Sequence, residues 1–156
     1  MKQLWQIAGF LRGLQAELRF GEFSRAPLKL LRFQVQEEIA ECDWVARSTD
    51  AWDATMPRRI REQRASLEAI HDAMKLRDLL FVLLPGIRQA VLRAFRQTAR
   101  EPPRLIIAGT VTAQSPAVKR VRSPVMRAKL YGFKFWMDDG VLVPFESVER
   151  SLEFAT

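Results

Sequence analysis

The chain has 156 residues, of which 48% are hydrophobic and 28% charged, and this composition excludes a predominantly disordered polypeptide. A single cysteine, Cys42, excludes an intramolecular disulfide, and the longest wholly apolar run, residues 79–84, is too short to span a membrane. We expect one soluble cytoplasmic domain over residues 1–156, with Pro102-Pro103 as its only reasonable internal boundary.

The net charge of +7 is concentrated in one part of the chain. Residues 1–78 carry 13 basic and 12 acidic side chains, whereas residues 79–137 carry 11 basic side chains and one acidic side chain, Glu101. Residues 138–156 carry one basic and five acidic side chains. Such clustering of charge indicates what kind of partner a protein binds, and it says little about the fold.

The first third of the chain predicts a helix and a hairpin. Apolar residues recur every three or four positions over residues 4–18, which indicates a helix. Apolar and polar residues alternate over residues 31–36 and 40–44, which indicates two strands with one apolar face. Because Glu37-Glu38 is a poor two-residue turn, we expect a longer loop or a bulge there.

The middle of the chain predicts two helices. Thr55 is a candidate cap for a helix whose apolar spacing runs over residues 60–84 and ends at Pro85-Gly86. Ile87, Val91 and Phe95 then recur every fourth position. We interpret residues 87–100 as a second helix, with its arginines largely opposite the apolar face.

The last third predicts strands on either side of a helix. Residues 105–111 indicate a strand that is buried on both faces, and Ser123 and Gly132 mark the start and end of a helix. A hairpin follows around Asp138-Asp139-Gly140. Strand, helix and strand over residues 104–137 predict a right-handed crossover between parallel strands. A short terminal helix is expected after Ser147.

These elements predict an α+β fold. We expect a single sheet of about five strands, including two hairpins and one β-α-β crossover, covered by three to four helices.

Residues for several kinds of chemistry are missing. The only histidine, His71, is expected within a helix, and Cys42 on the apolar side of a strand, so a structural role is favoured for both. One histidine and one cysteine cannot supply the ligands of a zinc site, and we expect no metal, no cofactor and no catalytic residue. Enzymatic activity stays uncertain, and a non-enzymatic protein is favoured.

Two acidic pairs are candidates for a magnesium site. Asp138 and Asp139 are explained more simply by hairpin geometry. Asp50 and Asp53 are explained about as well by capping of the helix that follows.

The basic segment, residues 88–134, is the strongest functional feature. We expect a binding module that contacts an anionic partner, with nucleic acid as the leading candidate. The proposed contact residues are Arg93, Arg96, Arg100, Lys119, Arg120, Arg122, Arg127 and Lys129. Nearby aromatic residues suit single-stranded nucleic acid. The alternative is a solvated face whose arginines pair with the acidic C-terminal residues, and no nucleic-acid-binding motif is present.

Two other functions compete with this hypothesis. Loop residues after the buried strand could hold a phosphate or carboxylate ligand in a small enzyme or ligand-binding protein. They are Thr110, Thr112, Gln114 and Ser115. Alternatively, the helix over residues 4–18 could form a homo-oligomer of a structural protein. Its low content of basic residues argues against a membrane partner.

Overall fold

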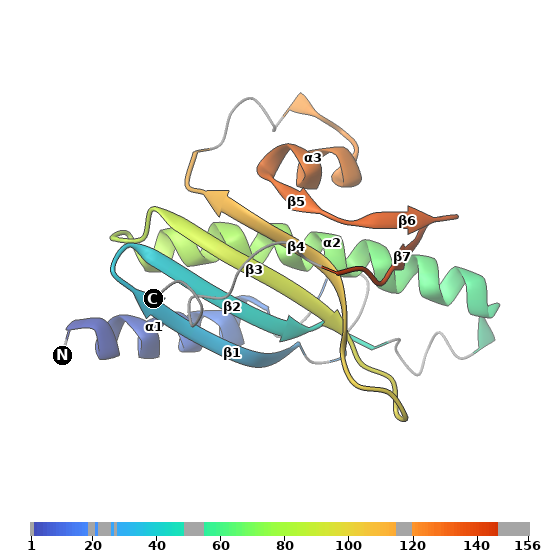
Figure 1. Cartoon of the computed structure of the whole chain (residues 1–156), viewed down its shortest axis with the longest axis horizontal. Coiled ribbons are helices and arrows are strands. Elements are labelled where there is room, and N and C mark those ends of the chain that lie inside the picture. Colours follow the sequence, from blue (N-terminus) through green and yellow to red (C-terminus); the bar gives the residue numbers. More distant parts are fainter. Residues whose placement is uncertain are drawn as a thin grey trace.

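The computed structural model describes residues 2–18, 21, 26, 28–48, 55–114 and 120–146 of the whole chain. Within these residues three helices and seven strands follow one another along the chain (Figure 1). In chain order they are α1 (Lys2–Glu17), β1 (Lys29–Gln36), β2 (Ile39–Val45), α2 (Arg58–Leu83), β3 (Gln89–Arg96), β4 (Arg104–Thr112), α3 (Pro124–Tyr131), β5 (Phe133–Lys134), β6 (Trp136–Asp138) and β7 (Val141–Val143). The predicted α+β class is confirmed.

The main sheet has five strands in the order β1-β2-β3-β4-β5. The pair β2 and β3 is parallel, and the other neighbouring pairs are antiparallel. Helix α2 therefore makes the β-α-β crossover, and it runs behind the strands in Figure 1. The second predicted hairpin is β6 and β7, which form a separate two-stranded sheet.

The crossover predicted over residues 104–137 is wrong, because β4 and β5 pair antiparallel. A parallel connection must return the chain along the whole length of the first strand. Phe133 instead pairs with Gly109 and Lys134 with Ala108, so the chain enters β5 beside β4 without returning to the start of β4. The 26 residues of α2 are long enough to make such a return.

The helix predicted over residues 87–100 is also wrong, because this stretch contains β3. A spacing of four residues satisfies the two-residue period of a strand as well as the helical period. Both faces of β3 are buried: Ala90, Leu92 and Ala94 have no exposed surface, and Val91 is 7% exposed. Ala90 and Ala94 therefore belong to a strand whose two faces are both covered, and not to a helix with one apolar face.

Helices α1 and α2 contribute to one apolar core with the sheet. The ring of Phe10 in α1 stacks on Phe33 in β1 with centroids 4.6 Å apart. The β1–β2 hairpin is confirmed, but the longer loop or bulge expected at its turn is wrong, since the irregularity in the pairing lies between Leu30 and Arg32. Gln36 pairs with Ile39, so only two residues form the turn, and Glu37 takes a φ of 57° to make it.

The local signals around α3 are confirmed. The Ser123 hydroxyl accepts a hydrogen bond from the Met126 amide at 3.3 Å, and Gly132 ends the helix with a φ of 113°. The position before α2 is Pro57, which makes no side-chain cap, so Thr55 is not the cap. The helix predicted after Ser147 lies outside the described residues. No helix in the described part of the chain is both long and apolar enough to cross a membrane.

Candidate functional site

The carboxyl ends of the parallel strands β2 and β3 meet at one edge of the sheet. The Ala46 amide, just after β2, donates a hydrogen bond to the Phe95 carbonyl in β3 at 2.8 Å. The chain continues from β2 toward α2, and from β3 through a turn to the antiparallel strand β4. The first turns of α2 contribute to the same place, because Glu62 and Ala65 line the space between these segments.

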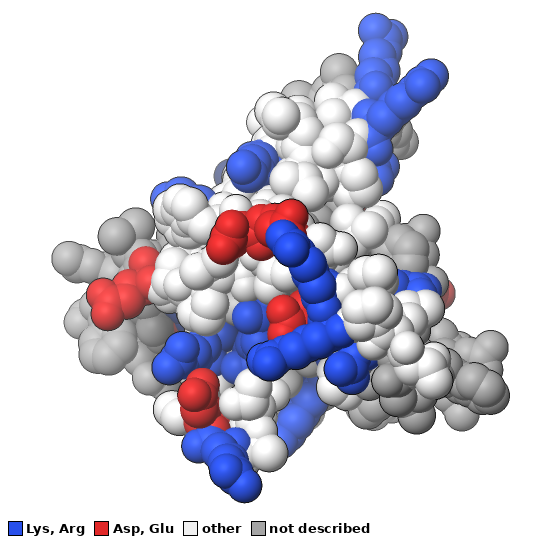
Figure 2. All heavy atoms as spheres, turned by 90° about the vertical axis from the view of Figure 1, so that its right-hand side faces the viewer, with Lys and Arg blue, Asp and Glu red and all other residues white. Residues whose placement is uncertain are grey.

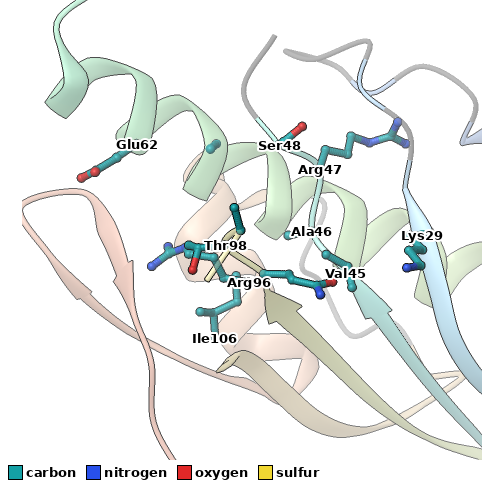
Figure 3. Close-up of a pocket in the computed structure, with 12 residues that line it drawn as sticks. Lys29, Val45, Ala46, Arg47, Ser48, Glu62, Arg96, Thr98 and Ile106 are labelled. Carbon is teal, nitrogen blue, oxygen red and sulfur yellow. The ribbon is translucent and has the colours of Figure 1, made fainter. Parts of the chain in front are cut away.

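A cavity of about 600 Å³ lies at this edge (Figure 3). This volume is within the usual range for small-molecule sites. Its lining residues are Lys29, Val45, Ala46, Arg47, Ser48, Glu62, Ala65, Arg96, Gln97, Thr98, Ala99 and Ile106. Five of these residues are aliphatic, and the other seven are polar or charged. The aliphatic part resembles the apolar walls of small-molecule sites, and the polar groups could orient a ligand there.

Arg96 is a charged residue of the cavity whose described hydrogen-bond partner is a backbone carbonyl. It is partly buried, and its Nη2 donates to the Leu142 carbonyl at 2.9 Å. Burial lowers the pKa of Arg96, and the negative charge of Glu62 opposes this shift. Among the described residues no carboxylate forms a salt bridge with Arg96. An anion in the cavity would therefore supply the partner that this guanidinium lacks.

The other charged groups of the cavity differ in their partners. The Glu62 carboxylate accepts from Arg58 Nε at 2.8 Å, and Arg47 Nε lies 2.8 Å from Asp72 Oδ2. The Arg47 guanidinium points away from the space between the other side chains (Figure 3). Lys29, exposed on β1, has no described carboxylate partner. Lys29 and Arg96 are thus the cations of the cavity that form no salt bridge with a described carboxylate.

A second cavity of about 310 Å³ adjoins the first. The two cavities share Glu62, Arg96 and Thr98. The remaining lining residues of the smaller cavity are Arg58, Glu101, Arg104 and Pro144. Arg96 therefore lies at the junction of a cavity with five aliphatic lining residues and a mainly charged cavity.

The surface around this edge has mixed charge. Figure 2 shows acidic side chains among basic ones across the middle of the face that lies at the right of Figure 1. Basic side chains alone protrude at its upper end, at the level of α3. Arg58 pairs with Glu62, Arg104 with Glu101, and Arg59 with Asp139. Such pairing of opposite charges is unlike a uniformly positive nucleic-acid-binding surface.

The predicted basic residues do not lie together on one helix. Arg93 is 7% exposed within β3, and its Nη1 donates to Glu41 Oε1 at 2.6 Å and to Asp43 Oδ1 at 3.0 Å. Arg96 lines the cavity, and Arg100 is exposed in the turn after β3. The helical stripe expected for these three arginines is therefore wrong, and Arg93 is occupied by buried carboxylates.

The remaining predicted contact residues lie near α3. Helix α3 begins at Pro124, so Arg120 and Arg122 precede it on an exposed segment. Lys129 is exposed and Arg127 is partly buried within the helix. Lys119 lies outside the described residues. The role of these residues in binding a polyanion stays a prediction.

The predicted ligand loop does not follow a strand of a parallel pair. Thr110 and Thr112 belong to β4, and the Gln114 carbonyl accepts from Arg77 Nη2 at 2.9 Å. Ser115 lies outside the described residues. Thr112 pairs with Gln89, the first residue of β3, so this end of β4 lies at the edge of the sheet opposite the cavity.

The predictions for the acidic pairs have different outcomes. Asp139 and Gly140 have φ values of 51° and 78°, which confirms that residues 138–140 form a tight hairpin turn. Asp50 and Asp53 lie outside the described residues. Among the residues that the structure does describe, no three His, Cys, Asp or Glu side chains are grouped so as to hold a metal ion.

Cys42 and His71, for which a structural role is expected, differ in exposure. Cys42 is fully buried, and its burial raises the pKa of the thiol. His71 is partly exposed and lines a small cavity of about 230 Å³ between α2 and α3.

Sequence reasoning missed most residues of the main cavity. Lys29, Glu62 and Thr98 come from β1, α2 and the turn after β3, and no sequence motif links them. If residues 89–96 are interpreted as a strand, the sequence predicts a β-α-β unit. The strand before α2 and the strand after it would then pair in parallel. Comparisons with protein-family models, with curated proteins and with solved structures found no match to this chain.

Proposed function

We propose that this protein binds a small anionic molecule, with a carboxylate or phosphate group, in the cavity at the carboxyl ends of β2 and β3. The observation that carries the proposal is the partly buried Arg96 guanidinium, whose described partner is a carbonyl rather than a carboxylate. A charge-assisted hydrogen bond in a partly dry site is stronger than one between neutral groups. A ligand anion would thus gain more binding free energy at Arg96 than at an exposed arginine.

Binding is favoured over catalysis by the groups that line the cavity. The described lining residues include no histidine or cysteine, and their only carboxylate, Glu62, is paired with Arg58. Nucleophilic catalysis needs a nucleophile next to a base that can accept its proton. The cavity offers cations and hydroxyl groups instead, which suit recognition of an anion.

The proposal can be tested with 8-anilinonaphthalene-1-sulfonate, a fluorescent aromatic anion. We expect saturable binding of one probe per chain, weakened at least about tenfold by Arg96→Gln because a charged partner is lost. Lys29→Gln should weaken binding by a smaller factor, because Lys29 is exposed. The matched control is Arg100→Gln, on the exposed turn outside the cavity, which should change nothing. Equal affinities for the native protein and Arg96→Gln would refute the proposal.

Binding of a polyanion is a second candidate. It is favoured by the exposure of Arg120 and Arg122 before α3 and of Lys129 within it. It predicts retention on single-stranded nucleic acid that declines steeply with salt concentration. Weak retention at low salt, or retention that salt does not alter, would contradict it.

A further inference from the structure

We infer that the ligand of the main cavity is an amphiphilic monocarboxylate, with its carboxylate at Arg96 and its apolar body in the aliphatic part of the cavity. This inference depends on the proposed binding of an anion and adds the chemical class of the ligand. Its basis is the arrangement of the two adjoining cavities, which differ in character and share Arg96.

The larger cavity provides the apolar part of the site. Its aliphatic lining residues are Val45, Ala46, Ala65, Ala99 and Ile106. Ile106 belongs to the buried core, with 1% of its surface exposed, so the cavity reaches from the surface down to the core. The Arg47 side chain contributes little charge to the interior, because its guanidinium is held by Asp72 and turned away (Figure 3). An ion without an apolar body would leave these walls in contact with water.

The junction of the cavities provides the polar part of the site. Arg96 and Thr98 line both cavities, and their guanidinium and hydroxyl groups are hydrogen-bond donors. A carboxylate has two oxygens that can accept from two such donors. The ligand head would therefore lie between the aliphatic space and the charged one.

The smaller cavity limits the charge of the head. Its three arginines are Arg58, Arg96 and Arg104, and it also contains the carboxylates of Glu62 and Glu101. Glu62 accepts from Arg58 at 2.8 Å, and Glu101 lies 3.5 Å from Arg104. The arginines beside Arg96 are thus already paired, and the two carboxylates repel additional negative charge. A monoanion fits this balance better than a phosphate dianion.

Isothermal titration calorimetry with a homologous series of probes tests the inference. The probes are acetate, hexanoate, octanoate, decanoate, decanol and inorganic phosphate. Burial of each methylene should raise the affinity about three- to fourfold, so affinity should rise from hexanoate to decanoate. Acetate and phosphate should bind much more weakly than decanoate. Decanol should bind more weakly than decanoate, because it lacks the charge.

Three variants separate the contribution of the carboxylate head from that of the apolar body of the ligand. Arg96→Gln should reduce decanoate affinity at least about tenfold and bring it close to that of decanol. Ala65→Leu adds a larger side chain on α2 and narrows the aliphatic part of the cavity. It should weaken the binding of decanoate and leave the affinity for acetate unchanged. Ala99→Leu narrows the same space from the exposed turn after β3, where the added side chain does not disturb the core. Arg100→Gln is the matched surface control.

The outcomes distinguish this inference from the proposed function. Acetate or phosphate that binds as tightly as decanoate and depends on Arg96 would overturn the amphiphilic ligand but leave anion binding intact. If decanol binds as tightly as decanoate and Arg96→Gln has no effect on either affinity, both the amphiphilic ligand and anion binding would be overturned. Failure of every probe to bind would also overturn both.

Discussion

Arg47 Nε lies 2.8 Å from Asp72 Oδ2, and this buried ion pair joins the end of β2 to the middle of α2. The same guanidinium donates to the Ala26 carbonyl at 2.7 Å and to the Leu18 carbonyl at the end of α1. Since Arg47 follows β2 at the wall of the main cavity, the pair fixes part of the proposed site. Burial and the charge of Glu68 raise the pKa of Asp72 to about 6, although Arg47 acts in the opposite direction.

The raised pKa of Asp72 predicts that stability depends on pH. Its value of about 6 in the folded protein lies above the ordinary value of about 3.9 in an unfolded chain. The folded state therefore holds the proton more tightly, and the free energy of unfolding should fall as the pH rises from about 4 to about 6. Above that range the contribution of Asp72 should be constant.

Asp72→Asn isolates this contribution, because an amide oxygen can still accept from Arg47 but does not titrate. Urea unfolding between pH 4 and pH 7.5 should show a smaller decline for Asp72→Asn than for the native protein. Equal declines in the two proteins would contradict the assignment.

Loss of Arg93 should destabilise the protein strongly. Arg93 Nη1 donates to Glu41 and Asp43, and Glu41 has no exposed surface. Arg93→Met would leave two buried carboxylates without this partner, which typically costs about 3–5 kcal/mol. Arg100→Met, on the exposed turn, should stay within about 0.5 kcal/mol of the native protein. Equal unfolding midpoints in denaturant for the two variants would show that the buried pairing is unimportant.

Elements defined by local signals were predictable from the sequence. The cap at Ser123, the end at Gly132 and the turn at residues 138–140 each depend on a few neighbouring residues. The strand β3 was not predictable in this way, since its spacing of four suits either period and both of its faces are buried.

The candidate site depends on that strand. Lys29, Glu62 and Arg96 are far apart in the sequence and meet only because β2 and β3 pair in parallel around α2. A non-local pairing of this kind leaves no motif in the chain. The site could therefore be found only from the arrangement of the elements.

A methyl group at Gly109 should disturb the contact between β4 and β5. A Cβ atom there would lie 2.7 Å from the Gly132 carbonyl oxygen and 3.0 Å from Phe133 Cα, and both are backbone atoms that cannot turn aside. We expect Gly109→Ala to cost about 1–3 kcal/mol.

The matched control is Gly9→Ala in α1, where nothing lies within 4 Å of the added atom. Alanine at this position should stabilise the helix by up to about 1 kcal/mol. The midpoint of thermal unfolding should therefore fall for Gly109→Ala and rise for Gly9→Ala. Equal shifts would show that the close approach at Gly109 is not maintained.

The Cys42 thiol should be unreactive in the folded protein. Cys42 has no exposed surface, and burial together with the neighbouring Asp43 charge raises the pKa of its thiol. Thiol reagents attack the thiolate, so both its inaccessibility and its protonation protect Cys42. We expect 5,5′-dithiobis(2-nitrobenzoate) to modify one thiol per chain in denaturant, since Cys42 is the only cysteine, and almost none in buffer at pH 8. Lys29→Cys supplies an exposed thiol on β1 as the positive control, which should react at once. Rapid modification of the native protein would mean that β2 opens to solvent, and the parallel pair that forms the cavity would then open with it.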